Sequence, residues 1–316
     1  MHTFAIGMPV RFRGISRREG VLLQGDAGWG EFSPFLDYAD VECVPWLACA
    51  LEAAHEGWPD PVRDRVPVNA TVPAVGPEQA AAIVRASGAS TAKVKVAERG
   101  QSLAEDIARV EAVRDALGPA GRVRVDANGG WSVDDAVVAI RALDTVGTLE
   151  YVEQPCADVE ELALVRRRVD VPVAADESIR RAADPYRVRD LEAADVAVLK
   201  VQPLGGVRAG LRVAEEIGLP VVVSSAVESS VGLAAGVALA AALPELPYAC
   251  GLGTTSLLDG DVTGDPLVPV DGWLPVRRVD ADPAALASVA ADVATAAAWT
   301  ARLDRVDALL RRGDAG

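Results

Sequence analysis

The stretch 123-VRVDANGGWSVDDAVVAIRALDTVGTLEYVEQP-155 contains one complete unit of the fold. Residues 123–127 and 149–152 are short runs rich in β-branched residues, as expected for parallel strands buried on both faces. Between them, residues 133–143 place apolar side chains at the spacing of an amphipathic helix. A strand, a helix and a second strand within about thirty residues predict a βαβ unit.

The same rhythm extends on both sides of this unit. Strands are predicted at residues 66–72, 92–96, 123–127, 149–152, 171–175, 196–201, 220–224 and 248–252, and helices at residues 103–117, 133–143, 159–168, 207–217 and 231–243. Eight strands alternating with helices predict an α/β fold, a (β/α)7β-type TIM-like barrel. An open doubly wound sheet is the alternative, but no Gly-rich nucleotide loop follows the first strand.

The chain on either side of this pattern has a different character. Residues 4–12 and 20–24 predict a hairpin, and residues 46–56 predict a helix, so a small α+β segment precedes the barrel. Residues 256–282 are rich in Gly, Pro and Asp and predict loops, whereas residues 283–312 are Ala-rich and predict helix. We therefore expect three parts, at residues 1–62, 63–256 and 257–316.

Composition excludes several classes of protein. The 316 residues carry a formal net charge of −15 without a basic run, which argues against nucleic-acid binding. The longest apolar run, residues 231–243, is too short to span a bilayer, and residues 1–10 do not resemble a signal peptide. Four scattered cysteines predict reduced, buried thiols in a cytoplasmic protein. With only His2 and His55, serine or cysteine triads and multi-histidine metal sites are excluded.

Lysine is rare in this sequence. Only three of the 31 Lys and Arg residues are lysines, namely Lys93, Lys95 and Lys200. A lysine can lose its proton when its surroundings lower its pKa, whereas arginine stays charged. The three lysines are therefore the first candidates for chemistry that needs an amine.

Polar residues recur at the carboxyl ends of the predicted strands, which is where barrels of this type build their active sites. From Lys93 onward the successive spacings are 33, 27, 23, 24 and 24 residues, one βα unit each. The residues concerned are Lys93 and Lys95, Asp126, Glu153, Asp176, Lys200, and Ser224 with Ser225. All three lysines therefore fall on one predicted ring.

The residue types on this ring predict a specific chemistry. Lys93 and Lys95 lie two apart on a strand and face the same side, so each is expected to lower the pKa of the other towards that of a general base. Asp126, Glu153 and Asp176 would repel one another unless a hard cation such as Mg²⁺ bound them. Singly, such residues are usually solvated strand edges or helix caps, but this does not explain the whole ring.

Seven motifs then identify a family. They are Gly28-Trp29-Gly30-Glu31-Phe32-Ser33-Pro34, Thr91-Ala92-Lys93-Val94-Lys95, Asp126-Ala127-Asn128, Val152-Glu153-Gln154-Pro155, Ala175-Asp176-Glu177-Ser178, Leu199-Lys200 and the segment from Ser224 to Ser230. Over nearly its whole length the chain resembles the enolase superfamily, and within it the o-succinylbenzoate synthases of menaquinone biosynthesis. The resemblance implies a capping domain at residues 1–62, with the C-terminal segment returning towards it.

The resemblance also implies a reaction, the syn-dehydration of the dicarboxylate 2-succinyl-6-hydroxy-2,4-cyclohexadiene-1-carboxylate to o-succinylbenzoate. Mg²⁺, or Mn²⁺ in its place, would be held by Asp126, Glu153 and Asp176. Lys95 would be the base, with Lys93 lowering its pKa, and Lys200 would stabilise the intermediate from the opposite face. The resemblance assigns the succinyl group to Ser224 and Ser225.

Two alternatives remain open from the sequence. A racemase of N-succinylamino acids, or a related epimerase, would use Lys95 and Lys200 as opposed bases on the same scaffold. Dipeptide epimerases usually carry an Asp-x-Asp pair after the eighth strand, but residues 251–256 read GLGTTS. A catalytically silent binding protein would leave the ring of lysines and carboxylates unexplained.

Overall fold

The computed structural model describes residues 1–12, 14–181 and 184–313. The chain begins with an antiparallel sheet in the order β1-β2-β3, formed by His2–Phe12, Ile15–Gly25 and Gly28–Phe32. A 3₁₀ turn (η1, Asp40–Cys43), helix α1 (Val44–Leu51) and a π-helical turn (η2, Glu52–Glu56) follow. The predicted hairpin and helix are confirmed, and we call this unit the cap.

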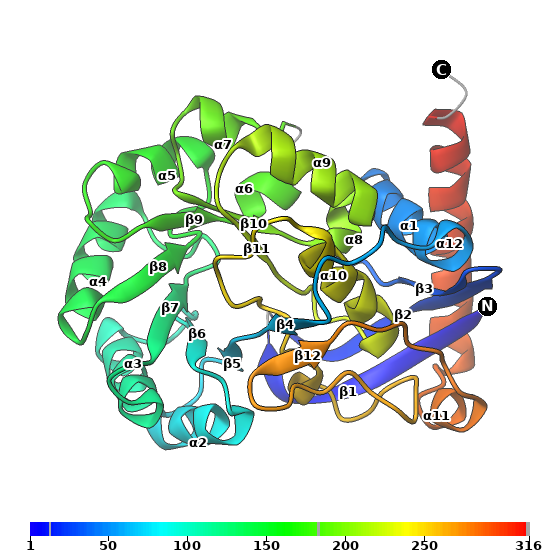
Figure 1. Ribbon diagram of the computed structural model, residues 1–316, viewed down its shortest axis with the longest axis horizontal. Helices are drawn as coiled ribbons and strands as arrows, with labels where there is room; N and C mark the ends of the chain where they lie inside the picture. Colours follow the sequence, from blue (N-terminus) through cyan, green and yellow to red (C-terminus); the bar gives the residue numbers. More distant parts are fainter. Residues whose placement is uncertain (13, 182–183, 314–316) are drawn as a thin grey trace.

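A parallel sheet of seven strands follows the cap, in the order β11-β10-β9-β8-β7-β6-β5. Each strand pairs with its neighbour in sequence, and the helices between them lie on the outside of the curved sheet (Figure 1). The strands are β5 (Ala70–Val72), β6 (Thr91–Lys95), β7 (Arg122–Asp126), β8 (Leu149–Glu153), β9 (Val173–Ala175), β10 (Val196–Leu199) and β11 (Val221–Val223). The fold is therefore the predicted α/β barrel with an N-terminal cap.

The helices that alternate with the strands bury their apolar faces against the sheet. They are α2 (Pro77–Ser87), α3 (Leu103–Leu117), α4 (Val133–Thr145), α5 (Val159–Arg166), α9 (Val207–Ile217) and α10 (Ser230–Ala242), with short helices α6 (Glu177–Arg180), α7 (Arg187–Asp190) and α8 (Val201–Leu204) between them. Ser102 and Glu105 form a capping box that fixes the start of α3. Helix α10 is buried over nearly its whole length.

Among the described residues, no helix has the length and apolar character needed to cross a membrane.

The closure of the barrel differs from the sequence prediction. The strand expected over residues 66–72 is two strands, because β4 (Arg65–Pro67) pairs with β12 (Trp273–Pro275) in a separate antiparallel sheet. Residues 248–252 do not form a continuous strand; parallel bridges join Cys250 to Val68 and Gly251 to Ser224. Pro67 has no N–H to donate, and a glycine such as Gly251 weakens a strand. The eighth strand predicted for the barrel is therefore replaced by these two bridges.

The segment after the barrel returns to the cap. It contains a 3₁₀ turn (η3, Thr255–Leu257), β12, α11 (Pro283–Ser288) and the long helix α12 (Val293–Gly313), so the helix expected over residues 283–312 is interrupted at residues 289–292. Helix α12, red in Figure 1, lies beside the blue cap strands. The indole of Trp299 packs edge-to-face on Phe32, with ring centroids 6.1 Å apart. The cap core therefore combines residues from both sides of the barrel.

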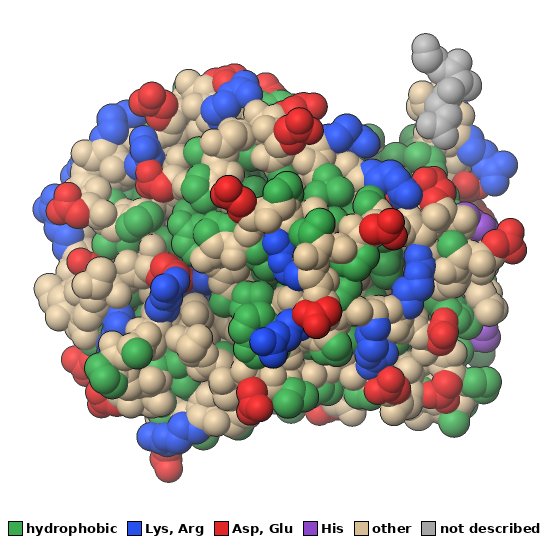
Figure 2. All heavy atoms as spheres, viewed as in Figure 1, with side chains coloured by type: hydrophobic (Ala, Val, Ile, Leu, Met, Phe, Trp, Pro, Cys, Tyr) green, Lys and Arg blue, Asp and Glu red, His purple; other side chains and the backbone are tan. Residues whose placement is uncertain are grey.

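Two further features concern the whole chain. All four cysteines are buried and free, as predicted. On the face shown in Figure 2, acidic and basic side chains are interspersed. The cytoplasmic location and the part boundaries near residues 62 and 256 stay predictions.

Candidate active site

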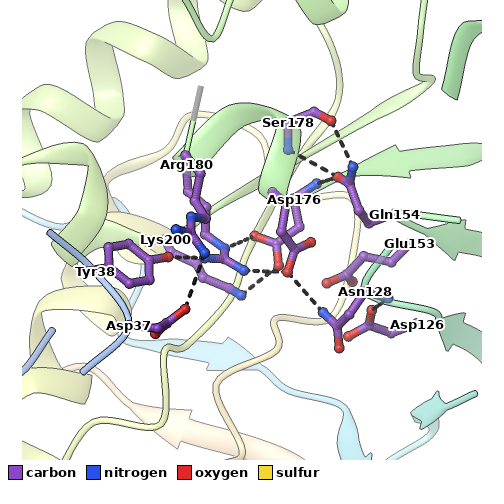
Figure 3. Close-up of polar contacts among 12 residues, drawn as sticks. Asp37, Tyr38, Asp126, Asn128, Glu153, Gln154, Asp176, Ser178, Arg180 and Lys200 are labelled. Carbon is purple, nitrogen blue, oxygen red and sulfur yellow. Dashed lines mark hydrogen bonds and ion pairs between the residues drawn. The ribbon is translucent and has the colours of Figure 1, made fainter. Parts of the chain in front are cut away.

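The polar residues predicted from strand ends lie together at one end of the barrel. Asp126 pairs in register with Lys95 on one side and with Glu153 on the other, so β6, β7 and β8 end at the same level. Asp176 and Lys200 directly follow β9 and β10, and Ser224 follows β11. Figure 3 shows the carboxylates and Lys200 converging from these strand ends. Every one of the eight predicted residues is buried, with at most 9% of its surface exposed.

Lys93 forms the inner ion pair of the site. Its Nζ lies 2.8 and 2.9 Å from the two Glu153 oxygens and 3.5 Å from Asp126 Oδ2. Burial opposes the charge on Lys93, but Glu153 and Asp126 outweigh it and hold the lysine pKa above its ordinary value. The expected lowering of a lysine pKa therefore does not apply to Lys93, because two carboxylates surround its ammonium group.

Asp176 is the centre of a second charged group (Figure 3). Lys200 Nζ donates to its Oδ2 at 2.7 Å, and Arg180 Nε donates to its Oδ1 at 2.8 Å. Burial alone would raise the pKa of Asp176, but these two cations hold it below its usual range. The Arg180 guanidinium also donates to Glu177 and to the hydroxyl of Tyr38, which belongs to the cap. The cap therefore reaches the second charged group through Arg180.

Lys95 has different surroundings from the other two lysines. Its Nζ lies 3.9 Å from Asp126 Oδ1 and has no hydrogen-bond partner within the described parts of the chain. A buried amine without a hydrogen-bond partner destabilises the folded protein, so such groups are rare and often have a functional role. Lys95 therefore differs from Lys93 and Lys200, which both hydrogen-bond to carboxylates, in having no such bond within the described residues.

The turns after these strands are strained. Asn128, Gln154 and Val227 have φ values of 44°, 40° and 64°, a region that residues other than glycine rarely occupy. Each lies within four residues of the end of a strand, close to a candidate site residue at or just after that end. Strain of this kind tends to concentrate at functional sites, where the surrounding structure enforces it.

A small cavity of about 30 Å³ lies between the site and the cap. That volume holds only one or two water molecules. Its walls come from the barrel (Thr71, Lys93, Asp126, Asn128, Lys200, Ser224, Ser225, Ala226, Val227, Gly251 and Thr254) and from the cap (Phe12 and Phe35). The cap therefore closes the open end of the barrel, and a molecule larger than this volume fits only where part of the wall moves.

The two predicted serines differ in what they can still bind. Ser225 Oγ donates to Glu228 and accepts from Val227 N at 2.7 Å and from Thr254 Oγ1 at 2.8 Å. Ser224 Oγ lies 3.5 Å from the Gly251 carbonyl, a weak contact, and borders the cavity. The Ser224 hydroxyl can therefore still bind a ligand, whereas the Ser225 hydroxyl is occupied by hydrogen bonds that stabilise the turn.

Arg180, Tyr38 and Phe35 belong to the site but were not among the residues predicted from the sequence. Arg180 follows Asp176 by four residues, and this i,i+4 spacing of acid and base on one helical turn was a usable signal. Gln154 also has a structural role, because its amide oxygen accepts from Asp176 N at 3.0 Å and from Ser178 N at 3.2 Å. Tyr38 and Phe35 gave no local signal, since only the folded cap brings them here.

The carboxylates can be tested for fit to a divalent cation. Across residues 1–12, 14–181 and 184–313, no three His, Cys, Asp or Glu side chains are already grouped closely enough to enclose a metal ion. The lysines and Arg180 neutralise the carboxylates instead. Burial nevertheless raises the pKa of Glu153 to about 7 against the lowering effect of Lys93, and the charges of Asp126 and Asp176 add to the rise. Three buried oxygen donors that repel one another on adjacent strands suit Mg²⁺.

Comparisons with known proteins agree with this geometry. A family model described as enolase C-terminal domain-like matches residues 77–283, and one described as enolase N-terminal domain-like matches residues 3–54. The chain is 72% identical to an o-succinylbenzoate synthase of Thermobifida fusca, over 95% of this chain and 93% of the relative. It is 58% identical to that of Mycolicibacterium smegmatis, over 98% and 96%.

Solved structures show the same architecture. A substrate complex of the L-Ala-D/L-Glu epimerase from Bacillus subtilis is 25% identical with a TM-score of 0.74, covering 88% of this chain and 95% of that one. A muconate lactonizing enzyme from Pseudomonas fluorescens, in complex with muconolactone, has a TM-score of 0.78 at 22% identity, covering 92% and 98%. At this level of identity the second likeness concerns the fold alone.

Proposed function

Since the chain belongs to the o-succinylbenzoate synthase family of the enolase superfamily, we propose that it catalyses the syn-dehydration of 2-succinyl-6-hydroxy-2,4-cyclohexadiene-1-carboxylate to o-succinylbenzoate in menaquinone biosynthesis. The observation that carries this proposal is the 72% identity over 95% of the chain. The buried ring of three lysines and three carboxylates supports it.

The difficulty of the reaction is the removal of a proton α to a carboxylate, because a second negative charge develops on the carboxylate oxygens. Asp126, Glu153 and Asp176 would hold Mg²⁺, with Mn²⁺ as a substitute, and the ion would stabilise that charge as a Lewis acid. Enolase-superfamily sites are known to combine a Lys or His base with bound metal.

Lys95 moves the proton in this proposal. Its neutral amine removes the α-proton, and the C–H electron pair passes into the enediolate. The enediolate electrons then form the new ring double bond as the carboxylate re-forms, and the C–O bond to the ring hydroxyl breaks on the same face with its electron pair on oxygen. The Lys95 ammonium returns the proton to that oxygen, so that water leaves. The absence of a hydrogen-bond partner for Lys95 among the described residues supports this role.

Lys93 and Lys200 stay positively charged in this proposal. Lys93 neutralises Glu153 and Asp126 at the base of the site. Lys200 follows β10, which lies four places from β6 in the strand order and therefore on the opposite side of the barrel. Its ammonium group is proposed to stabilise the enediolate from the face opposite Lys95. Ser224 is proposed to bind the succinyl group, with Ser225 holding the turn beside it.

A spectroscopic assay of o-succinylbenzoate formation tests the proposal. We expect turnover with Mg²⁺, loss of turnover with EDTA, and recovery when Mg²⁺ is added back in excess. Product formation that continues unchanged in EDTA would contradict the metal role. No product under any of these conditions would contradict the reaction itself.

The opposed lysines also favour a second activity, racemisation of N-succinylamino acids. Because β6 and β10 lie four places apart in the strand order, Lys95 and Lys200 would approach a bound α-carbon from opposite sides in this proposal. Incubation of one enantiomer in D₂O measures this activity. Deuterium at the α-carbon with loss of optical rotation supports a two-base site, and an unexchanged α-carbon excludes it.

A further inference from the structure

The turn between β11 and α10 forms part of the cavity wall and has an unusual backbone. Ala226 and Val227 border the cavity, and Val227 has a φ of 64°. A β-branched residue strongly disfavours this left-handed conformation, so neighbouring groups must enforce it. The Val227 side chain packs on Met8 and Leu257, while its carbonyl points to the cap.

A buried arginine of the cap binds that carbonyl. Arg18, on β2, exposes only 2% of its surface, and its Nε donates to the Val227 oxygen at 3.1 Å. The same guanidinium donates to Ser33 Oγ at 3.0 Å and to the Ser33 carbonyl. It also lies 4.5 Å from the ring centre of Phe35, which borders the cavity from the cap side. Arg18 thus contacts two walls of the cavity without lining it.

Glu31 extends this contact to the start of α10. Its Oε1 accepts from Ser33 Oγ at 2.5 Å, and its Oε2 accepts from Ser229 N at 3.1 Å and Gly232 N at 3.2 Å, as well as from the Ser229 hydroxyl. A Cβ atom on Gly232 would lie 2.8 Å from Glu31 Cδ, so glycine is needed for this close approach. The buried carboxylate therefore caps α10 from another part of the fold.

Together these contacts fix both ends of one short segment. Arg18 holds Val227, and Glu31 holds the first turn of α10, with Ser33 joining the two side chains. We call Arg18, Ser33 and Glu31 the cap anchor. We propose that Arg18 is a positioning residue for substrate binding, which holds the turn 225–227 and the ring of Phe35 against the cavity. This inference rests on the proposed function, because it takes the cavity to be the substrate pocket.

The test is a substitution at Arg18 in three backgrounds. Lysine keeps the positive charge near Glu31. Its single ammonium group, however, cannot reach both the Val227 carbonyl and Ser33, which the planar guanidinium of Arg18 binds at the same time. In the parent enzyme, Arg18→Lys is expected to raise KM about tenfold and to change kcat less than about threefold, since a loss of uniform binding affects KM. Arg17→Lys, at the exposed neighbouring arginine, is the matched control and is expected to leave KM unchanged.

The second and third backgrounds separate positioning from general damage to the cap. Glycine adopts a positive φ without strain, whereas alanine does not. Val227→Gly and Val227→Ala remove nearly the same side chain, so they differ mainly in backbone strain. Arg18→Lys is expected to raise KM less than about threefold in the glycine background and about tenfold in the alanine background.

The outcomes are distinguishable. Equal effects of Arg18→Lys in the glycine and alanine backgrounds would overturn the inference. So would an unchanged KM in both Arg18→Lys and Arg18→Met, the second of which removes every donor. Thermal melts of each variant establish that the compared proteins are folded. Absence of turnover in the parent enzyme would instead count against the proposed function.

Discussion

At the scale of single residues, the clearest expectation concerns Lys95. Arginine fits a site that needs a cation but keeps its charge at any working pH, so it cannot accept a proton. Lys95→Arg is therefore expected to fold and to bind Mg²⁺ while losing dehydration by at least about a hundredfold. Product formation, metal titration and a thermal melt measure the three properties. Retained turnover would remove Lys95 from the role of base.

Arg180 leads to a different expectation, because it acts through Asp176. Partners that orient a metal ligand commonly change metal affinity about ten- to a hundredfold when they are replaced. Arg180→Lys keeps one charge but cannot bind Asp176, Glu177 and Tyr38 together. We expect the Mg²⁺ concentration for half-maximal activity to rise about tenfold.

Arg187→Lys is the matched control for this experiment, because Arg187 is an exposed arginine that pairs with Glu160 at the surface. Its Mg²⁺ requirement is expected to match that of the parent enzyme. Equal Mg²⁺ requirements in the Arg180 variant and the control would show that Arg180 does not orient Asp176.

At the scale of elements, the contact between β3 and α10 predicts a pH effect on stability. Burial raises the pKa of Glu31 from 4.5 to about 7, against the lowering effects of Ser229, Ser33 and Arg18, while Glu228 adds to the rise. Between pH 4.5 and pH 7, Glu31 is therefore largely protonated in the folded protein and largely ionised in the unfolded chain. The free energy of unfolding therefore gains a contribution at low pH that is lost as pH rises through 7.

Comparison with Glu31→Gln isolates this contribution, since the variant lacks the titrating group. Urea unfolding at pH 5 and pH 8 is expected to show the stability of the parent, relative to the variant, falling by up to about 3 kcal/mol over that interval. All other titrating groups are common to both proteins. A difference that does not change with pH would mean that Glu31 titrates normally in the folded protein.

The elements also show how far the sequence could lead. The strand-end ring was predictable because each βα unit repeats at nearly constant spacing and parallel strands end at one edge. The closure of the barrel was not, since Pro67 and Gly251 interrupt strands whose pairing depends on distant partners. The contacts between the cap and the rest of the molecule were missed for a related reason. Arg18 and Val227 lie 209 residues apart in sequence, and Tyr38 and Arg180 lie 142 residues apart.

At the scale of the whole molecule, the cap depends on a helix that follows the barrel. Trp299, on α12, exposes 3% of its surface, packs on Phe32 and donates from its indole nitrogen to Glu19 at 2.9 Å. Trp299→Ala is expected to lower the free energy of unfolding by about 3–5 kcal/mol. Trp273→Ala, at a partly exposed tryptophan, is expected to cost less. Chemical denaturation measures both, and equal losses would contradict this account of the cap core.

The return of α12 also has a consequence for biosynthesis. Phe32 and Trp46 leave the ribosome before the barrel, but Trp299 and Val306, which complete the same apolar cluster, are translated after it. Domains usually fold in the order in which they are made. Here the nascent N-terminal sheet has to wait, with aromatic surface uncovered, while the barrel is synthesised. Cellular yield of this protein should therefore respond to translation speed and to chaperone supply more than the stability of the finished enzyme suggests.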